Sequence, residues 1–314
     1  MKAITFHEFG GPEVLHLEEI DKPVPRDNEV LIEVHASSLN PVDAKSITKD
    51  SRYRSSIHLP TIPGLDVAGV IEKVGENIKT LHAGDLVYGQ ASVLRKGTGA
   101  FAEYAVTSED ALAHMPRSLS FVQAASVPLA ACSAYEALID HIHLHAGQRI
   151  LIHGGSGGIG SFAIQLAKHL KADVTTTATG EGMEFCHNLG ADLVVDYKQE
   201  AFEQLGPIYD AVLDTVGGDT YRRSFQVLKP GGIIVSMLAT PDEALMRRYA
   251  VTAVLEMTAI YKKVLTEIAE LIDHGILKVH IAEIYPLHQT KDAYRAKEQK
   301  KVLGKIVITV NHKK

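Results

Sequence analysis

A glycine-rich stretch from Gly154 to Gly160 has the most specific chemistry in this sequence. Gly155, Gly157 and Gly160 form the pattern G-x-G-x-x-G between an apolar run, Arg149 to His153, and a helical stretch. The first glycine permits a tight turn, the second lets the backbone approach a pyrophosphate, and the third lets the helix pack closely. The helix N-terminus adds free N–H groups and a positive dipole end. We therefore expect a dinucleotide site formed by Gly155, Ser156, Gly157, Gly158, Ile159 and Gly160.

The end of the next apolar run, Val174 to Ala178, indicates which dinucleotide binds. NAD sites usually place an acid there to hold the ribose hydroxyls, but Asp173 lies at the entry of the run, too early to reach them. Thr177 and Thr179 are small hydroxyl residues that leave room for a 2′-phosphate, so we expect NADP(H). Glu181 opposes this preference, because its charge would disfavour a nearby phosphate.

Strands and helices alternate around this turn and predict a doubly wound parallel sheet. Continuous apolar strands separated by helices are typical of βαβ crossovers, with helices covering both faces of the sheet. The predicted strands are Arg149 to His153, Val174 to Ala178, Leu193 to Asp196, Tyr209 to Asp214 and Gly232 to Met237.

The chain before residue 120 instead predicts a β-rich lobe, because short β-branched runs are broken by Gly and Pro. Its runs are Val30 to His35, Val67 to Val74, Asp85 to Tyr88 and Ala100 to Val106. A helical pair is predicted within Ser120 to Ile139, a helix at Thr258 to His274, and strands at Val279 to Ile284 and Lys305 to Val310. We therefore predict an α/β Rossmann domain at residues 121–275, inserted into a β-rich domain formed by residues 1–120 and 276–314.

Composition narrows the class of partner. The chain has 314 residues, 46% hydrophobic and 22% charged, which fits ordinary globular domains and excludes disordered or fibrous classes. Its net charge of −6, without a basic block, argues against nucleic acid and leaves a small molecule as the expected partner. No apolar run approaches the roughly 18 residues that span a bilayer, and no secretory signal is evident. The two cysteines, Cys132 and Cys186, form neither a disulfide framework nor a zinc motif, so we expect a reducing cytoplasm.

Many short motifs in order resemble one family over essentially the whole chain. They are Gly10 to Leu15, Asn40 to Lys45, Pro63 to Gly69, Gly84 to Gly89, Gly99 to Tyr104, the Gly154 to Gly160 turn with Gln165, Leu189 to Asp192, and Gly304 to Val307. The chain is identified as a member of the medium-chain dehydrogenase/reductase superfamily and resembles its zinc-free branch of quinone oxidoreductases and alkenal/enone reductases. The resemblance implies a GroES-like catalytic domain interrupted by the Rossmann domain, with the nicotinamide in the cleft between them.

Zinc is not expected. By position, the three catalytic zinc ligands of the superfamily correspond to Asn40, to Leu65 with Asp66, and to Leu129, and an amide with two leucines cannot hold the metal. The structural zinc loop is absent too, because residues 89–99 contain no cysteine. His141, His143 and His145 alternate near a helix end and are expected to be solvent-exposed rather than ligands.

Without a Lewis acid, hydride transfer to a quinone or to the β-carbon of a conjugated enone is easier than alcohol oxidation. Charge then develops on a carbonyl oxygen, which hydrogen-bond donors stabilise. The resemblance places Asn40 and Lys45 beside the nicotinamide as donors, with Asp43 orienting its neighbours or pairing with Lys45, and Tyr53 as a further candidate. Each residue also has a structural interpretation: a turn pair for Asn40 with Pro41, a solvated lysine and a loop aromatic.

The resemblance also implies cofactor contacts outside the glycine-rich turn. They are Ser133 near the nicotinamide amide, Tyr197 and Lys198 near the 2′-phosphate, and Val216, Leu238 and Ala239 along the cofactor. The leading hypothesis is a zinc-independent, NADPH-dependent reductase of quinones or α,β-unsaturated carbonyls, acting as a homodimer. An enoyl-thioester reductase and a non-catalytic NADPH-binding protein are the alternatives, and turnover of an enone panel discriminates them.

Overall fold

The computed structural model describes residues 1–299 and 302–310, which divide into two compact units. The first unit contains Met1–Leu129, Ile260–His274 and the described residues from Val279 onward. The second contains Ala130–Ala259 and Gly275–Lys278. The second unit is therefore inserted into the sequence of the first.

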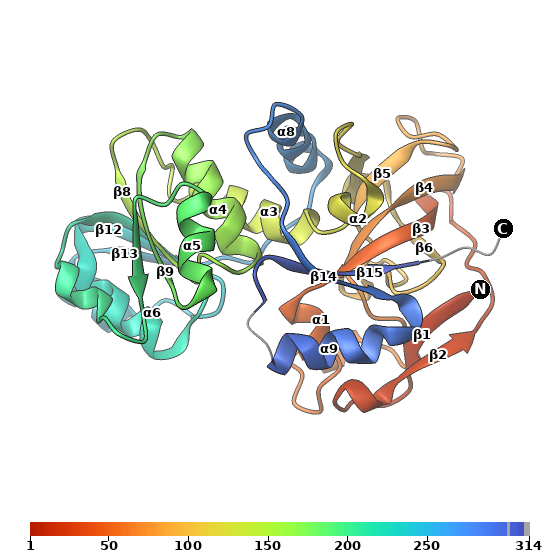
Figure 1. Ribbon diagram of the computed structural model, residues 1–314. Helices are drawn as coiled ribbons and strands as arrows, with labels where there is room; N and C mark the ends of the chain where they lie inside the picture. The colour runs from red at the N-terminus through yellow and green to blue at the C-terminus, as the bar shows by residue number, and fades with distance from the viewer. Residues whose placement is uncertain (300–301, 311–314) are drawn as a thin grey trace. The chain divides into compact units, whose positions relative to one another are not determined.

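The first unit is built on a seven-stranded β-sheet (Figure 1). Strands β14, β15, β3, β4, β5 and β7 follow one another across this sheet, β6 also pairs with β3, and β1 and β2 form a separate antiparallel pair. The strands are β1 Lys2–Phe6, β2 Leu15–Glu19, β3 Glu29–Leu39, β4 Asp66–Val74, β5 Leu86–Gln90, β6 Tyr104–Ser108, β7 Leu112–His114, β14 Ile281–Pro286 and β15 Lys305–Thr309. The helices are α1 Pro41–Ser46, α2 Phe121–Ala124, α8 Lys262–Asp273 and α9 Thr290–Gln299. Apolar side chains from both ends of the chain, such as Phe6, Phe101 and Ile308, share one core.

The second unit contains a six-stranded parallel sheet in the order β10-β9-β8-β11-β12-β13. This is the strand order of a dinucleotide-binding fold, whose two halves meet between β8 and β11. The strands are β8 Arg149–His153, β9 Asp173–Ala178, β10 Leu193–Asp196, β11 Tyr209–Asp214, β12 Leu228–Ser236 and β13 Thr252–Leu255. The helices are α3 Pro128–Tyr135, which begins at the unit boundary, α4 Gly158–His169, α5 Glu181–Asn188, α6 Gly218–Ser224 and α7 Glu243–Tyr249, with a π-helix at Glu136–His141.

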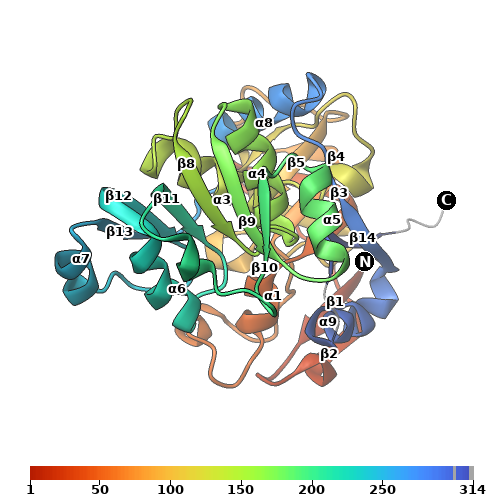
Figure 2. The same ribbon diagram turned by 60° about the vertical axis from the view of Figure 1, so that its left-hand side comes forward.

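Helices cover the parallel sheet as right-handed crossovers require. Helices α4 and α5 pack on β8, β9 and β10, and they lie side by side over these strands in Figure 2. Helices α6 and α7 follow β11 and β12, which lie on the other side of β8 in the strand order. Helix α6 packs on both of these strands, and α7 packs on β12. A right-handed connection in the opposite direction places a helix on the opposite face. The predicted doubly wound sheet is confirmed, together with its two-domain setting.

The boundaries between the units differ from the expected residues 120 and 276. Helix α8, expected in the Rossmann domain, packs against β7, and the Tyr88 hydroxyl donates to the Leu265 carbonyl over 2.5 Å. Helix α2 packs on β3 and β4, with the Phe121 ring stacked 4.2 Å from that of His35. Both helices therefore belong to the first unit, because their apolar faces are buried against its sheet.

Several strands also differ from the sequence prediction. Strand β6 begins at Tyr104 rather than Ala100, because Ala100 and Phe101 donate to the carbonyls of Gly64 and Pro63, and Glu103 bonds to Lys2. Strands β1, β2, β7 and β13, each of three to five residues, are not among the predicted strands. No helix among residues 1–299 and 302–310 has the length and apolar character needed to cross a membrane.

Candidate active site

The glycine-rich turn joins β8 to α4, with Gly157 as the residue before the first helical turn. A Cβ atom on Gly155 would lie 2.1 Å from the Thr176 hydroxyl, and one on Gly160 would lie 2.3 Å from the Gly154 carbonyl. Packing thus requires both positions to be glycine. The left-handed residue of the turn is Gly154, with φ of +71°, rather than Gly155. A Cβ atom on Gly157 would have one neighbour within 4 Å, the Gly154 carbonyl at 3.4 Å, so this side of the turn is open to the approach of a ligand.

The carboxyl ends of β9 and β10 carry the residues expected near a 2′-phosphate. Thr179 is half-buried, and Tyr197 and Lys198 are exposed. The Tyr197 N–H donates to the Ala178 carbonyl over 3.3 Å, which ties the two strand ends together. Glu181 is exposed as the first residue of α5. Hydroxyl and ammonium donors, together with the carboxylate of Glu181, therefore lie at the carboxyl edge of the parallel sheet.

Thr177 lies in the same place but faces inward. Its side chain is 4% exposed, and its hydroxyl accepts the Gly154 N–H over 3.1 Å. It also contacts the His153 ring over 3.2 Å. The hydroxyl thus supports the phosphate turn from below, because Thr177 is the register partner of His153 inside the sheet.

The remaining expected cofactor residues of this unit divide into buried and exposed positions. Ser133 is 2% exposed, and its hydroxyl is 2.7 Å from that of Thr258. Val216 and Leu238, in the loops after β11 and β12, are 50% and 45% exposed. Ala239, beside Leu238, is half-buried. The two exposed apolar side chains offer a surface to a flat ring.

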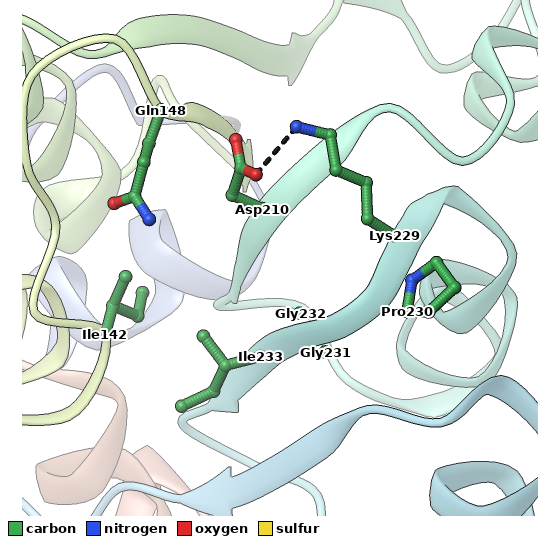
Figure 3. Close-up of a pocket in the computed structure, with 8 residues that line it drawn as sticks. All are labelled: Ile142, Gln148, Asp210, Lys229, Pro230, Gly231, Gly232 and Ile233. Carbon is green, nitrogen blue, oxygen red and sulfur yellow. Dashed lines mark hydrogen bonds and ion pairs between the residues drawn. The ribbon is translucent and has the colours of Figure 1, made fainter.

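A hollow of about 210 Å³ at the opposite end of the sheet is a poor match for a dinucleotide (Figure 3). It is lined by Ile142, Gln148, Asp210, Lys229, Pro230, Gly231, Gly232 and Ile233. Asp210 and Lys229 form an ion pair at 2.7 Å, so their charges neutralise each other. These residues begin strands β11 and β12, whereas ligands of parallel sheets bind at the carboxyl ends.

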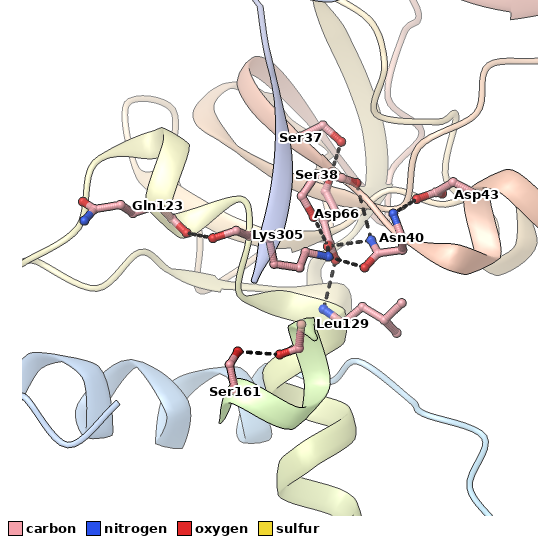
Figure 4. Close-up of polar contacts among 11 residues, drawn as sticks. Ser37, Ser38, Asn40, Asp43, Asp66, Gln123, Leu129, Ser161 and Lys305 are labelled. Atoms are coloured by element: carbon pink, nitrogen blue, oxygen red, sulfur yellow. Dashed lines mark hydrogen bonds and ion pairs between the residues drawn. The ribbon is translucent and has the colours of Figure 1, made fainter. Parts of the chain in front are cut away.

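The first unit contains a buried polar cluster around Asn40 (Figure 4). The Asn40 side-chain N–H groups donate to Asp66 Oδ2 over 2.7 Å and to the Ser38 carbonyl over 3.4 Å. Lys305 Nζ donates to Asn40 Oδ1 and lies 3.5 Å from Asp66 Oδ2. Asn40, Asp66 and Lys305 are 2%, 0% and 6% exposed. Every polar atom of the Asn40 amide therefore has a protein partner.

Asp43 borders this cluster from the first turn of α1. Its carboxylate accepts the Asn40 backbone N–H over 2.8 Å, which closes the start of the helix, rather than pairing with Lys45. Burial raises the pKa of Asp43 to about 7; the Asn40 N–H opposes this rise, the charge of Asp66 adds to it, and Lys305 opposes it. Burial lowers the pKa of Lys305 against the opposing charges of Asp66 and Asp43.

The two other expected catalytic residues lie outside the cluster. Lys45 is exposed in the last turn of α1. Tyr53 is half-buried before a short 3₁₀ turn, and its hydroxyl accepts an N–H of Arg52 over 2.6 Å. The structure thus places Asp43 and Lys45 within one short helix and Asn40 at its N-cap, with Asn40 and Asp43 buried and Lys45 in solvent.

Comparison with known proteins decides the family. Residues 26–117 match the alcohol dehydrogenase GroES-like domain, and residues 189–308 match the zinc-binding dehydrogenase family. The chain is 38% identical to the NADPH-dependent alkenal/one oxidoreductase, chloroplastic, of Arabidopsis thaliana, covering 98% of this chain and 79% of the relative. The quinone oxidoreductase from Coxiella burnetii superposes with a TM-score of 0.93 at 34% identity, covering 99% of both chains. The Escherichia coli quinone oxidoreductase complexed with NADPH has a TM-score of 0.88 at 27% identity, covering 98% of this chain and all of the other.

The chain belongs to the quinone and alkenal/one oxidoreductase group of the medium-chain dehydrogenase/reductase superfamily. The sequence resemblance assigns Asn40, Leu65 with Asp66, and Leu129 to the zinc-ligand positions of this superfamily, and the structure brings Asn40 and Asp66 into contact. Leu65 is buried, and the Leu129 backbone N–H donates to Asp66 Oδ1 over 2.9 Å. Among the residues that the structure describes, no three His, Cys, Asp or Glu side chains gather as metal ligands.

Some side chains of this oxidoreductase were missed or misplaced by sequence reasoning. Asp66 was considered only as a lost zinc ligand and Lys305 only as part of a motif, although a lysine opening an apolar strand is a usable signal. His141 was expected in solvent, yet it is half-buried and contacts the buried Glu256 carboxylate. Cys132 and Cys186 are buried thiols.

Proposed function

We propose that this protein is a zinc-independent, NADPH-dependent oxidoreductase that transfers hydride to a quinone or to the alkene of an α,β-unsaturated carbonyl. The names of its relatives support this activity, and the donor set of the Asn40 cluster carries the proposal of zinc independence. An ammonium group, Lys305, already lies beside Asp66 and bonds to Asn40. A divalent cation at the same place would meet this positive charge, an amide, two leucines and the single carboxylate of Asp66, with no thiolate or imidazole ligand.

The residues of the second unit support NADPH rather than NADH. No carboxylate stands at the end of β9, where NAD sites hold the ribose hydroxyls. Thr179, Tyr197 and Lys198 offer hydroxyl and ammonium groups at the same edge of the sheet. We infer that they contact the 2′-phosphate, and that Gly155 to Gly160 bind the pyrophosphate at the N-terminus of α4.

The bound cofactor supplies the hydride, so the chain's own task is to stabilise charge on the substrate carbonyl oxygen. We propose Lys45 as the principal donor, because it is exposed in the last turn of a short helix whose start is fixed by buried groups. Asn40 holds that helix start, since its amide atoms are bonded to Asp66 and Lys305. The Tyr53 hydroxyl accepts from Arg52 and keeps its own hydrogen as a second donor.

A substrate panel with the Lys45→Ala variant tests this function. Wild-type protein with enones and quinones should oxidise NADPH, followed by absorbance, and Lys45→Ala should lower kcat by about 10² to 10³. NADPH affinity should change little, because the charge acts mainly in the transition state. Lys49→Ala removes another exposed lysine nearby and serves as the matched control. A loss below about threefold would make Lys45 part of the scaffold, and NADPH binding without turnover of any substrate would instead indicate a binding protein.

We further propose a homodimer in a reducing cytoplasm, with a small molecule as substrate and no nucleic-acid partner. Strand β13 ends the parallel sheet, so its outer edge can pair with a second copy. The buried thiols of Cys132 and Cys186 fit a reducing compartment. Light scattering during gel filtration measures the assembly state, and a mass of 34.1 kDa would contradict the dimer.

A further inference from the structure

Four polar residues form the last shared row of the parallel sheet at its carboxyl edge. Thr177 of β9 is the register partner of His153 of β8, which pairs in turn with Asp214 of β11, and Asp214 pairs with Ser236 of β12. Their exposed fractions are 4%, 1%, 0% and 0%. Central strands of such a sheet are usually apolar, so a continuous polar row at this edge calls for a physical reason.

Thr177, Asp214 and Ser236 each accept a hydrogen bond from at least one backbone N–H group in the loop after a strand. Asp214 Oδ1 accepts the N–H groups of Val216 and Gly217 over 3.0 and 2.9 Å, within the loop after β11. Ser236 Oγ accepts the N–H groups of Leu238 and Ala239 over 3.1 and 2.9 Å, within the loop after β12.

One bond joins these two supports. The Ser236 hydroxyl donates to Asp214 Oδ2 over 2.7 Å, so a single carboxylate and hydroxyl fix both loops. The loops also touch, because a Cβ atom on Gly217 would lie 3.1 Å from that of Leu238. With three donors on its two oxygens, the Asp214 carboxylate is satisfied without a cation.

We propose that Asp214 and Ser236 are positioning residues that hold the loops after β11 and β12 in the conformation that receives the nicotinamide half of NADPH. This inference rests on the proposed cofactor contacts of Val216, Leu238 and Ala239. Strands β8, β9 and β10 form the half of the sheet that binds the adenosine side, and β11 begins the other half. The Asp214 and Ser236 pair therefore acts on one half of the ligand only.

The exposed apolar side chains on these loops favour a ligand role over simple loop closure. Val216 and Leu238 remain half in solvent although buried groups fix the backbone beneath them. Leaving such side chains in water is unfavourable unless a partner covers them. A planar ring placed against them regains that contact, and prior fixing of the loops reduces the entropy lost on binding.

Ligand halves provide the test, with Ser236→Ala as the main variant. NADPH and adenosine 2′,5′-bisphosphate, which lacks the nicotinamide half, are each titrated by fluorescence or calorimetry. In Ser236→Ala the Kd for NADPH should rise about tenfold, equal to about 1.4 kcal/mol, while the Kd for the bisphosphate stays within about twofold. Ser126→Ala removes another fully buried hydroxyl, which donates to the Gln123 carbonyl, and should change neither affinity.

Asp214→Asn is the second variant. Its amide oxygen can still accept from Val216 and Gly217, but its NH₂ group then faces a Ser236 oxygen that already accepts two N–H groups. The NADPH Kd should rise as in Ser236→Ala, and the double variant should lose less than the product of the two single losses. Ser236→Thr retains the hydroxyl and should restore NADPH affinity.

Three outcomes overturn the proposal. The first is an unchanged Kd for NADPH in both variants. The second is an equal rise of the Kd values for NADPH and the bisphosphate. The third is a double variant whose loss of NADPH affinity equals the product of the two single losses. Equal weakening would mean that the pair supports the whole unit rather than one half of the site. Wild-type protein that binds no NADPH would instead refute the proposed cofactor, a result that is distinguishable because it requires no variant.

Discussion

Replacing Asp43 with Asn should remove a pH-dependent loss of stability from the first unit. In the folded protein, burial raises the pKa of this carboxyl to about 7 from its ordinary value of 3.8. Below about pH 4 both states hold the proton and the residue costs nothing. As the pH rises, the unfolded chain releases the proton while the folded chain keeps it, so stability falls until the pH passes 7. Asn40 can still donate its backbone N–H to the amide oxygen of the variant.

The size of the effect follows from the size of the shift. A rise of about 3 pKa units corresponds to about 4 kcal/mol, of which about 3 kcal/mol lies between pH 5 and pH 8. With an unfolding entropy of about 2.1 cal/mol/K per residue over 314 residues, this converts to about 4 °C in Tm. Asp43→Asn should therefore gain about 4 °C on wild type between pH 5 and pH 8.

Thermal melts followed by circular dichroism at half-unit pH steps measure this difference. Asp50→Asn removes an exposed carboxylate of the same unit and controls for the change in net charge. If the Tm curves of wild type and Asp43→Asn run parallel within 1 °C from about pH 5 to 8, Asp43 ionises as an ordinary carboxyl. The argument that burial beside Asp66 raises its pKa would then be refuted.

Further expectations concern metal and cofactor. Purified protein should contain no stoichiometric zinc and keep its activity in chelator, because the Asn40 cluster holds Lys305 beside Asp66; one zinc per chain by elemental analysis would contradict this. Fluorescence titration should give tighter binding of NADPH than of NADH, and Glu181→Lys should widen the gap by replacing repulsion with attraction; equal affinities in wild type would argue against a 2′-phosphate site. Gly160→Ala should abolish NADPH binding and lower Tm, because its Cβ would lie 2.3 Å from the Gly154 carbonyl; an unchanged Kd would mean that the turn relaxes without cost.

The sequence alone was sufficient for features whose cause is local. The glycine-rich turn, the absence of an acid after the second Rossmann strand and the alternation of apolar strands with helices all depend on residues near one another in the chain. The family match confirms the recognition built on them. Short or irregular elements were harder, as β13 shows, because four residues carry too little pattern to stand out.

Side-chain partnership and burial were decided only by the tertiary structure. Lys305 bonds to Asn40 across 265 positions, so no local pattern could pair them or show that the Asn40 amide is occupied. Thr177 matched a ligand-facing hydroxyl by type, yet register with His153 turned it into an internal support for the phosphate turn. The row from Thr177 to Ser236 joins residues of four strands in the same way. Residue types and local turns follow from the sequence, whereas the atoms left free to meet a ligand depend on contacts that form only when distant strands align.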